Sequence, residues 1–289
     1  MSNPKIGFIG FGEAAAGIAE GLVGEGVTGI AAFDPRPRPQ QVGVTMAGTI
    51  ENMLAISDIV FAAVTCTVAL DVARQAAPFL TDRHLYVDIN SVSPDTKIAV
   101  GTLVMDAGAR YVEAAVMAGV PGYQHKVPML LSGEAAPQLI AAMTPLGMEL
   151  EDFGPELGRA SALKMFRSIM IKGMEALFQE CVLGAEHYGV AKKVLDSIAD
   201  GYPGIDWDHM AHHLIGRTAI HGERRAHEMD EVADTLRAIG IDPIMSEAAS
   251  KRIMWAANKG LKETFPGDAP KDYRDVIKAI HAFDEKIKG

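Results

Sequence analysis

Cysteine is scarce in this sequence. Only two cysteines, Cys66 and Cys181, occur in 289 residues, and they form no spaced motif of the kind that binds zinc. Small secreted proteins that depend on disulfides use far more cysteine than this. The pattern therefore favours two buried thiols in a reducing compartment, and cytoplasm is the expected location.

Basic residues are also in deficit. The chain has 27 Lys and Arg against 37 Asp and Glu, which gives a formal net charge of −10. This balance argues against a nucleic-acid partner. No apolar run approaches the length of a membrane-spanning helix, so no membrane partner is expected. Residues 1–5 lead directly into the first predicted strand, and no signal peptide is expected.

A glycine-rich stretch near the N-terminus is the most informative motif. An apolar run over residues 6–9 is typical of a buried parallel strand, and residues 13–23 favour a helix. Gly10, Gly12 and Ala15 form the pattern G-x-G-x-x-A between them. The first glycine permits a tight turn, the second lets a pyrophosphate approach the backbone, and the alanine lets the helix pack close. The sequence therefore predicts a dinucleotide-binding turn.

The residues expected to touch the dinucleotide follow from this turn. The first helical turn offers N–H groups and a positive dipole end to the phosphates. A second strand over residues 29–33 ends at Asp34, about 20 residues past the glycines, where a ribose-binding carboxylate belongs. A turn without a ligand, with Asp34 in solvent, is the alternative. The predicted cofactor-binding residues are Gly10, Phe11, Gly12, Glu13, Ala14, Asp34 and Thr65, of which Thr65 could equally cap a strand end.

The identity of the cofactor depends on a conflict between neighbouring charges. Asp34 favours NAD, because it accepts a hydrogen bond from the ribose 2′-hydroxyl and repels a 2′-phosphate. Arg36 and Arg38, in the proline-rich loop that follows, could instead bind that phosphate. We predict NAD and keep NADP as the alternative.

Strand and helix signals alternate up to about Gly158, and then strand signals disappear. The alternation predicts an α/β fold with a mostly parallel, doubly wound sheet. Further strands are expected over residues 58–64, 85–89, 110–116 and 129–133. Helices are expected over residues 160–188, 191–199, 206–215, 222–239, 243–257 and 272–287. We predict a Rossmann domain over residues 1–158 and an all-α domain over 159–289, which begins with a long interdomain helix.

Four blocks of sequence, in order, resemble the β-hydroxyacid dehydrogenase family, which includes 3-hydroxyisobutyrate and 6-phosphogluconate dehydrogenases. The glycine turn is the first block. Residues 87–94 (VDINSVSP) are similar to the family's D-x-S-T-x-S-P, and residues 113–119 (EAAVMAG) to its D-A-P-V-S-G-G. Residues 158–168 are similar to its G-x-x-x-x-x-K-x-x-x-N helix. The resemblance covers almost the whole chain, and residues 224–229 (RRAHEM) place it nearer a poorly characterised branch.

The resemblance implies a hydride transfer between a β-hydroxy acid, or a related alcohol, and a nicotinamide cofactor. It also implies a homodimer built through the helical domains, with a small molecule as substrate. Lys164 takes the place of the family's general acid/base, and Ser168 follows one turn later. The residues implied in substrate binding are Asn90, Ser91, Met117, Gly119 and His227.

The chain departs from the family at three of these positions. Met117 replaces a serine that helps to hold a substrate carboxylate, and a thioether gives no charge-assisted hydrogen bond. Ser168 replaces an asparagine, and His227 aligns with a lysine. Fold and cofactor therefore carry over more directly than substrate. A ketone or imine reductase of the same fold, or a non-catalytic nucleotide-binding sensor, are the alternative functions.

Several of these residues also have a purely structural interpretation. Lys164 could be a solvated helix lysine, although apolar residues flank it and Lys172 lies two turns along the same predicted helix. Asn90 and Ser91 could cap the helix that starts at Pro94. Arg224, Arg225 and His227 could bind anions or form an exposed paired face. His209, His212 and His213 could suggest a metal, but no zinc motif accompanies them and no metal is expected.

Overall fold

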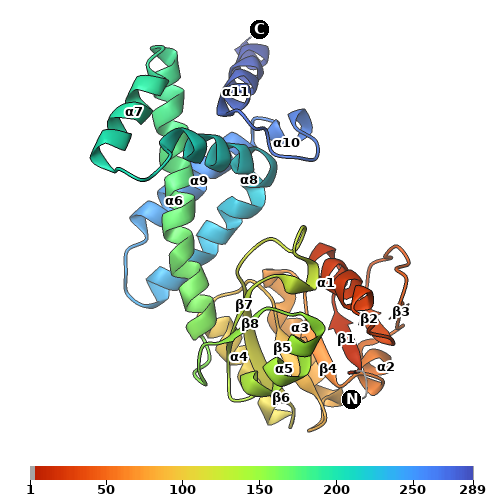
Figure 1. Ribbon diagram of the computed structural model, residues 1–289. Coiled ribbons are helices and arrows are strands. Elements are labelled where there is room, and N and C mark those ends of the chain that lie inside the picture. The colour runs from red at the N-terminus through yellow and green to blue at the C-terminus, as the bar shows by residue number, and fades with distance from the viewer. Residues whose placement is uncertain (1–3, 289) are drawn as a thin grey trace. The chain divides into compact units, whose positions relative to one another are not determined.

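The computed structural model describes residues 4–288 and separates the chain into two compact units, Met1–Lys164 (unit 1) and Met165–Gly289 (unit 2). Figure 1 shows the elements of each unit. Residues 1–3, where no signal peptide was expected, lie outside the described part. This division falls within helix α6 (Arg159–His187), shortly after its start. The domain boundary predicted from the sequence lies at the first residue of that helix, between residues 158 and 159.

Unit 1 is built on one sheet of eight strands among the described residues. Their spatial order is β3-β2-β1-β4-β5-β6-β7-β8, and all neighbours are parallel except β6 and β7. The predicted fold class, a mostly parallel α/β sheet followed by an all-helical region, is confirmed. The strands are β1 (Ile6–Ile9), β2 (Ile30–Phe33), β3 (Val44–Met46), β4 (Ile59–Ala62), β5 (Leu85–Asp88), β6 (Arg110–Val116), β7 (Met129–Ser132) and β8 (Leu150–Asp152).

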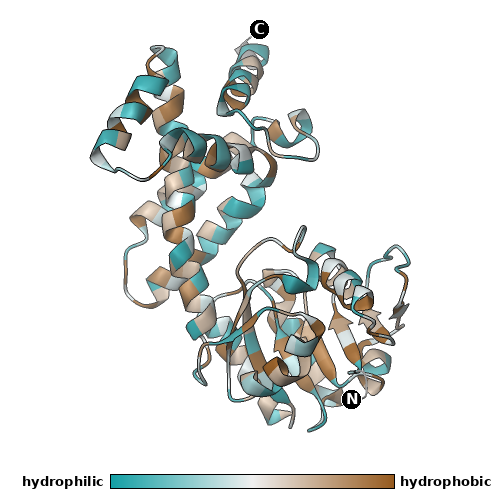
Figure 2. Ribbon diagram, in the orientation of Figure 1, coloured by the Kyte–Doolittle hydropathy of each residue, from teal (hydrophilic) through white to brown (hydrophobic). Residues whose placement is uncertain are grey.

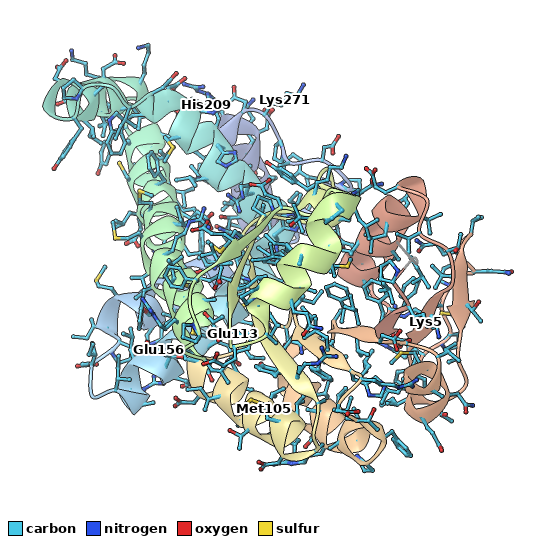
Figure 3. The ribbon with its side chains drawn as sticks, turned by 60° about the horizontal axis from the view of Figure 1, so that its bottom comes forward. Lys5, Met105, Glu113, Glu156, His209 and Lys271 are labelled. Atoms are coloured by element: carbon cyan, nitrogen blue, oxygen red, sulfur yellow. The ribbon has the colours of Figure 1, made fainter. Side chains whose placement is uncertain are left out.

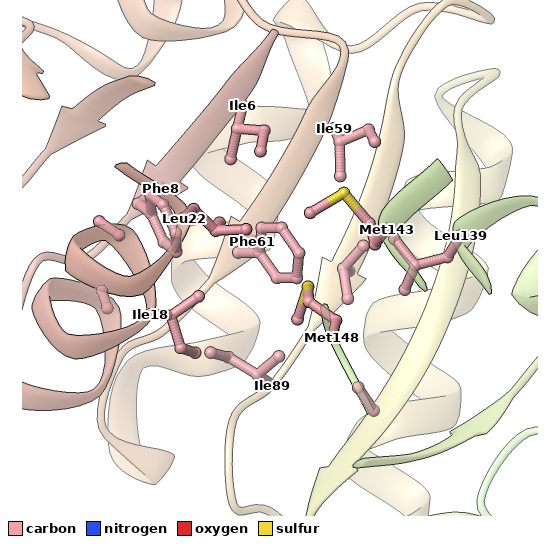
Figure 4. Close-up of a cluster of buried hydrophobic side chains, with 14 of the residues drawn as sticks. Ile6, Phe8, Ile18, Leu22, Ile59, Phe61, Ile89, Leu139, Met143 and Met148 are labelled. Carbon is pink, nitrogen blue, oxygen red and sulfur yellow. The ribbon is translucent and has the colours of Figure 1, made fainter. Parts of the chain in front are cut away.

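Helices cover both faces of this sheet, because successive strand side chains point to opposite faces. Phe8 and Phe61 stack at 5.4 Å between ring centroids in the core cluster under α1 and α5, which Figure 4 shows. Ile9 and Val60 belong to the cluster on the other face, under α2, α3 and α4. The helices are α1 (Glu13–Gly24), α2 (Ile50–Ala55), α3 (Ala69–Ala76), α4 (Pro94–Asp106) and α5 (Ala136–Met143).

The strands of unit 1 are mostly apolar along their length, as Figure 2 shows, and this is why most of them could be predicted. Two strands were missed. The three-residue strands β3 and β8 form the two edges of the sheet, and most of their side chains are exposed. They therefore lack the apolar run that marks a buried strand.

Unit 2 is all-helical. Most of α6 packs with α8, α9 and α11 around apolar cores that include Phe178, Leu214 and the fully buried ring of Tyr273. No helix of the described residues is long and apolar enough to cross a membrane. The helices after α6 are α7 (Ala191–Gly201), α8 (Trp207–Ala238), α9 (Ile244–Ala257), α10 (Leu261–Thr264) and α11 (Tyr273–Lys288).

The predicted break over residues 216–221 is wrong, because α8 continues through it. The two glycines at this break serve close packing. A Cβ added to Gly216 would lie 2.5 Å from the carbonyl oxygen of Pro270, and one added to Gly222 would lie 2.9 Å from Cβ of Ala257 on α9. Each glycine therefore lets another segment approach the helix closely, at the cost of helix propensity.

Candidate functional site

Gly10 forms a tight turn at the point where the strand order reverses. Its φ is +85°, its amide donates to the carbonyl oxygen of Phe33 at 2.8 Å, and an added Cβ would lie 2.4 Å from the carbonyl oxygen of Ala63. No other residue fits there without moving the backbone. The carboxyl ends of β1, β2 and β4 meet at this turn, which is where open α/β sheets bind ligands.

Gly12 and the start of α1 are open to a ligand. A Cβ added to Gly12 would meet no described atom within 4 Å, so packing within the protein does not explain this glycine. No side chain caps the N-terminus of α1, and Glu13 and Ala14 lie exposed in its first turn. Ala15 is fully buried against the sheet. These features fit the pyrophosphate of a dinucleotide.

Asp34 is held firmly at the end of β2. Its Oδ2 accepts the Phe11 amide at 2.9 Å and the Arg38 guanidinium at 2.7 Å, and its Oδ1 accepts the Arg36 amide at 2.9 Å. Burial alone would raise the pKa of this carboxyl, but the hydrogen bonds from Arg38, Phe11 and Arg36 outweigh it and hold the pKa below its ordinary value. The side chain is only 3% exposed. The interpretation of Asp34 as solvated is therefore wrong.

A groove of about 590 Å³ runs beside this turn. Phe11, Gly12 and the loop from Arg38 to Val42 line it, and Gln41 Nε2 ties the loop to the carbonyl oxygen of Ala16 at 3.0 Å. Its charged lining residues are Glu13, Glu20 and Arg38. Because Asp34 offsets the charge of Arg38, the groove is acidic.

Asn90 joins the ends of β4 and β5. Its Oδ1 accepts the Val64 amide at 2.6 Å, while its buried Nδ2 has no partner among residues 4–288. The helix that follows is capped by Ser93, whose Oγ accepts the Thr96 amide. The interpretation of Asn90 and the exposed Ser91 as helix caps is therefore wrong. An unpaired, buried donor at the carboxyl end of a strand suits a ligand acceptor.

Thr65 follows β4 and is exposed. Its hydroxyl lies 3.3 Å from that of Thr67 and caps no helix. The position of Thr65 at a strand end remains compatible with the predicted cofactor contact.

A buried ion pair, which was not predicted from the sequence, lies next to Asn90 and accepts a hydrogen bond from its amide. Lys97 Nζ lies 3.0 Å from Asp88 Oδ1, which also accepts the Asn90 amide at 2.9 Å. Tyr111 donates to Asp88 Oδ2 at 3.1 Å, and burial, aided by the charge of Asp88, raises the pKa of Tyr111. Lys97 shares its helix face with buried Val100 and Val104, a spacing that could have marked it as an inward-facing lysine.

Met117 and Gly119 follow the end of β6. Met117 is half-buried and its amide donates to the carbonyl oxygen of Pro128 at 2.9 Å. A Cβ added to the exposed Gly119 would meet no described atom within 4 Å. Both residues thus lie at the same edge of the sheet as Gly10 and Asn90, because β6 is parallel to β5.

Lys164 lies on the first turns of α6, which the sheet holds in place. The buried carboxylate of Glu113 on β6 accepts the Gly158 amide at 2.5 Å and the Ser161 amide at 2.6 Å (Figure 3). Gly158 has a φ of +89°. Lys164 follows one turn after this clamp and is half-buried. The sequence identified Glu113 only as part of a motif, because its partners lie far along the chain.

In unit 2, Ser168 and Lys172 lie one turn apart on α6 and contact each other. Lys172 Nζ donates to Ser168 Oγ at 3.0 Å and lies 2.8 Å from Glu228 Oε2 on α8. Burial holds the pKa of Lys172 below its ordinary value, although Glu228 opposes the shift.

The basic residues of the RRAHEM segment differ in their surroundings. Arg225 is buried and forms a bidentate ion pair with Glu175 of α6, so it is not part of an exposed face. Arg224 is exposed and pairs with Glu228 at 2.6 Å, as the surface interpretation expected. His227 is exposed. No hydrogen bond or ion pair among residues 4–288 joins it to the other predicted site residues.

His209, His212 and His213 of α8 do not converge on one point. His212 accepts the Tyr273 amide at 3.1 Å and packs on its ring, whereas His209 and His213 stack at 6.2 Å. No group of three or more His, Cys, Asp or Glu side chains arranged for a metal ion occurs in residues 4–288. Cys66 and Cys181 are half-buried and form no disulfide.

Two family models match parts of the chain. The model described as NADP oxidoreductase coenzyme F420-dependent matches residues 5–91, which contain the glycine turn, Asp34 and Asn90. A domain of unknown function (DUF1932) matches residues 185–255, which contain α7 and α8. Neither model covers half of the chain.

Solved structures of other proteins match nearly the whole chain. A conserved hypothetical protein from Sinorhizobium meliloti is 37% identical, with 98% of this chain and 97% of that one covered and a TM-score of 0.80. A conserved protein of unknown function, described as structurally similar to 3-hydroxyacid dehydrogenases, is 31% identical, with 94% and 98% covered and a TM-score of 0.74. The chain belongs to this family of 3-hydroxyacid dehydrogenase-like proteins. The resemblance inferred from the four sequence blocks is confirmed.

One of the more distant relatives with a named activity is a dehydrogenase. The 2-(hydroxymethyl)glutarate dehydrogenase of Eubacterium barkeri is 27% identical over 194 residues, which are 63% of this chain and 64% of that protein. The matches together establish an NAD(P)-binding dehydrogenase fold of the hydroxyacid dehydrogenase or reductase type.

Proposed function

We propose that the protein is an NAD-dependent oxidoreductase that transfers a hydride between a β-hydroxy acid, or a related alcohol, and the nicotinamide. The observation that carries this proposal is the Gly10–Gly12 turn at the switch point of the sheet, open to a pyrophosphate. The named activity of the Eubacterium barkeri relative supports the substrate class.

Lys164 is the proposed general acid/base. The nicotinamide, when bound, supplies the hydride acceptor, and the substrate hydroxyl must lose a proton as hydride leaves its carbon. Lys164 would accept that proton and return it in the reverse direction, which requires a neutral amine near the working pH. Asn90, whose buried Nδ2 has no partner among residues 4–288, would orient the hydroxyl. Glu113, by fixing the first turn of α6, would limit where the Lys164 amine can lie.

NAD is the proposed cofactor in preference to NADP. Arg38, the cation in the groove lining, is paired with Asp34. The pair has no net charge, so it attracts a 2′-phosphate only weakly. Glu13 and Glu20 line the same groove and would repel that phosphate. Arg36, 72% exposed, is the residue that could reverse this preference.

A ketone or imine reductase is the second candidate. One observation favours it, which is the half-buried thioether of Met117 where relatives place a serine that holds a carboxylate. An imine substrate requires a proton donor more than a hydroxyl base, so retention of Lys164 favours the dehydrogenase.

A second copy of the chain is the proposed partner. Phe166, Met170 and Leu177 share one face of α6 and are 40%, 65% and 58% exposed. Exposed apolar side chains along one helix face suit a contact between helical domains. Light scattering measures the molar mass of wild type and of a double variant that carries Met170→Glu and Leu177→Glu. If these residues form the dimer contact, the wild type is a homodimer and the double variant is a monomer.

An absorbance screen at the reduced-nicotinamide band tests the function. Both cofactors are combined with hydroxy acids, their esters, ketones and imines in both directions. Turnover of hydroxy acids with NAD supports the proposal, and turnover confined to imines or ketones supports the second candidate. Cofactor binding without turnover of any substrate would indicate a nucleotide sensor instead.

A further inference from the structure

One cluster of charged side chains from α6 and α8 in unit 2 contains more cations than carboxylates. Lys172 pairs with Glu228 at 2.8 Å, and Arg224 pairs with the same carboxylate at 2.6 Å. Arg225 pairs with the buried Glu175. With Arg217, also on α8, four cations face two carboxylates, and both carboxylates are already engaged.

Arg217 is the cation left over. It is half-buried, and no carboxylate oxygen of residues 4–288 lies within 4 Å of it. Its Nη1 lies 3.4 Å from Nε2 of His213. A guanidinium can only donate, so the imidazole accepts this hydrogen bond through its unprotonated nitrogen. Burial and the nearby charge of Arg225 lower the pKa of Arg217, although Glu175 opposes them. A guanidinium presents five N–H donors in a rigid fork, and few of them are used here.

A stripe of histidine and arginine side chains that includes Arg217 runs along α8. His209, His213, Arg217 and His221 follow one another at four-residue spacing, and Arg224 comes three residues later, so all lie close to one face of the helix. Arg217 and Arg224 are about two turns apart. Burial and the charge of Arg217 lower the pKa of His213, which favours the neutral ring that accepts from Arg217. Figure 3 labels His209 at the start of this stripe.

We propose that Arg217, with Arg224 and the neighbouring His213 and His221, binds an oxyanion, the carboxylate or phosphate group of a small molecule. The fork of Arg217 matches the two oxygens of such a group, and Arg224 supplies a second cation on the same face. The negative charge of the ligand would neutralise the positive charge that Glu175 and Glu228 do not offset. This site includes neither the glycine turn nor Lys164, and it does not depend on hydride transfer.

The oxyanion proposal is tested by binding rather than by turnover, on the full chain in a chloride buffer without cofactor. Titration calorimetry with inorganic phosphate and with malonate should show saturable binding of at least one of them. The probe that binds more tightly identifies the group as phosphate or carboxylate. Arg217→Gln should weaken that binding by about tenfold or more, because a charge-assisted bidentate contact is lost.

Arg237→Gln is the matched control. Arg237 lies on the same helix but already pairs with Asp234 and Glu247, so its loss should leave anion affinity unchanged. Thermal unfolding gives a second readout, in which the anion raises the Tm of wild type and of Arg237→Gln but not of Arg217→Gln. Absence of saturable binding in wild type, or equal affinity in wild type and Arg217→Gln, would overturn the proposal and leave the oxidoreductase proposal untouched.

Discussion

The carboxylate of Glu113 accepts the backbone amide of Ser161 at 2.6 Å across 48 positions of sequence, and its other oxygen accepts the Gly158 amide. This clamp links the middle of β6 to the first turn of α6. Amides at the start of a helix have no partner within the helix, so a buried carboxylate supplies both hydrogen bonds and favours the positive end of the helix dipole.

Glu113→Ala should lower the free energy of unfolding by about 1–3 kcal/mol for each amide left without a partner. Urea denaturation followed by circular dichroism measures the change. Glu156→Ala is the control, because Glu156 is 74% exposed and forms only a surface pair with Arg159 at 3.6 Å. That pair should contribute less than about 1 kcal/mol. Equal effects of the two substitutions would mean that the clamp adds nothing to stability.

Lys164→Ala should reduce turnover by about 10²–10⁴-fold, as loss of a general base typically does, while the Kd for the cofactor stays unchanged. Lys164→Arg should restore little, since a guanidinium stays protonated. Stopped-flow rates and cofactor titrations measure the two effects, and the exposed Lys192, substituted by alanine, is the control. If Lys164→Ala turns over within a few-fold of wild type, another group transfers the proton, with Lys172 and His227 to be tested next.

Asp34→Ser should weaken NADH binding and strengthen NADPH binding, because it removes a ribose acceptor and releases the Arg38 guanidinium from its carboxylate. Titration calorimetry with both cofactors gives the ratio of the two Kd values. Asp71→Ser, which removes an exposed carboxylate from a pair with Arg74, should leave the ratio unchanged. Tighter binding of NADPH by the wild type would show that Arg36 or Arg38 already dominates.

The stability contributed by Asp34 should depend on pH. The pKa of Asp34 is lowered in the folded protein by its hydrogen bonds, so the ionised form stabilises the fold. That contribution is complete above the unfolded pKa of about 3.9 and is lost as the pH falls through the lower folded pKa. Asp34→Asn should therefore be less stable than wild type at about pH 7, and the gap should close on strong acidification. A gap that stays constant over this range would contradict the assignment.

Met117→Ser should increase the preference for a hydroxy acid over its methyl ester by about 10- to 100-fold, since a hydrogen bond to a charged group contributes roughly 1.5–3 kcal/mol. The ratio of kcat/KM for acid and ester measures it. Met105→Ser, at an exposed methionine of α4, is the control. If the wild type already rejects the ester as strongly as the variant does, a cation such as Arg224 holds the carboxylate.

The nucleotide turn could be predicted because its signals are local. The apolar run of β1, the glycines and Asp34 each report their own backbone geometry. Other parts depend on distant segments. Gly216 resembles a helix break in sequence, and only the approach of Pro270 explains why a helix keeps it. The spacing of Lys97 to Val100 and Val104 predicts that it faces inward, but only the structure shows that its ion-pair partner is Asp88 at the end of β5.

The site residues divide in the same way. Gly10, Gly12 and Asp34 lie where the motif predicts, and the buried Nδ2 of Asn90 adds a reason to retain that residue. The partners of the Glu113 clamp lie 45 or more positions away in the sequence. The surplus charge at Arg217 becomes visible only when the charges of α6 and α8 are counted together. Sequence spacing carries no information on either.

The Glu113 clamp also has a consequence for the order of events during synthesis. Glu113 leaves the ribosome 45 residues before Gly158 does, a delay of several seconds at about 5–20 residues per second. Until then the carboxylate has no amide to accept from and cannot be buried without a large penalty. The ionised carboxylate would therefore keep the middle of β6 hydrated until then, and the arrival of the first turn of α6 would let unit 1 close its core around Glu113.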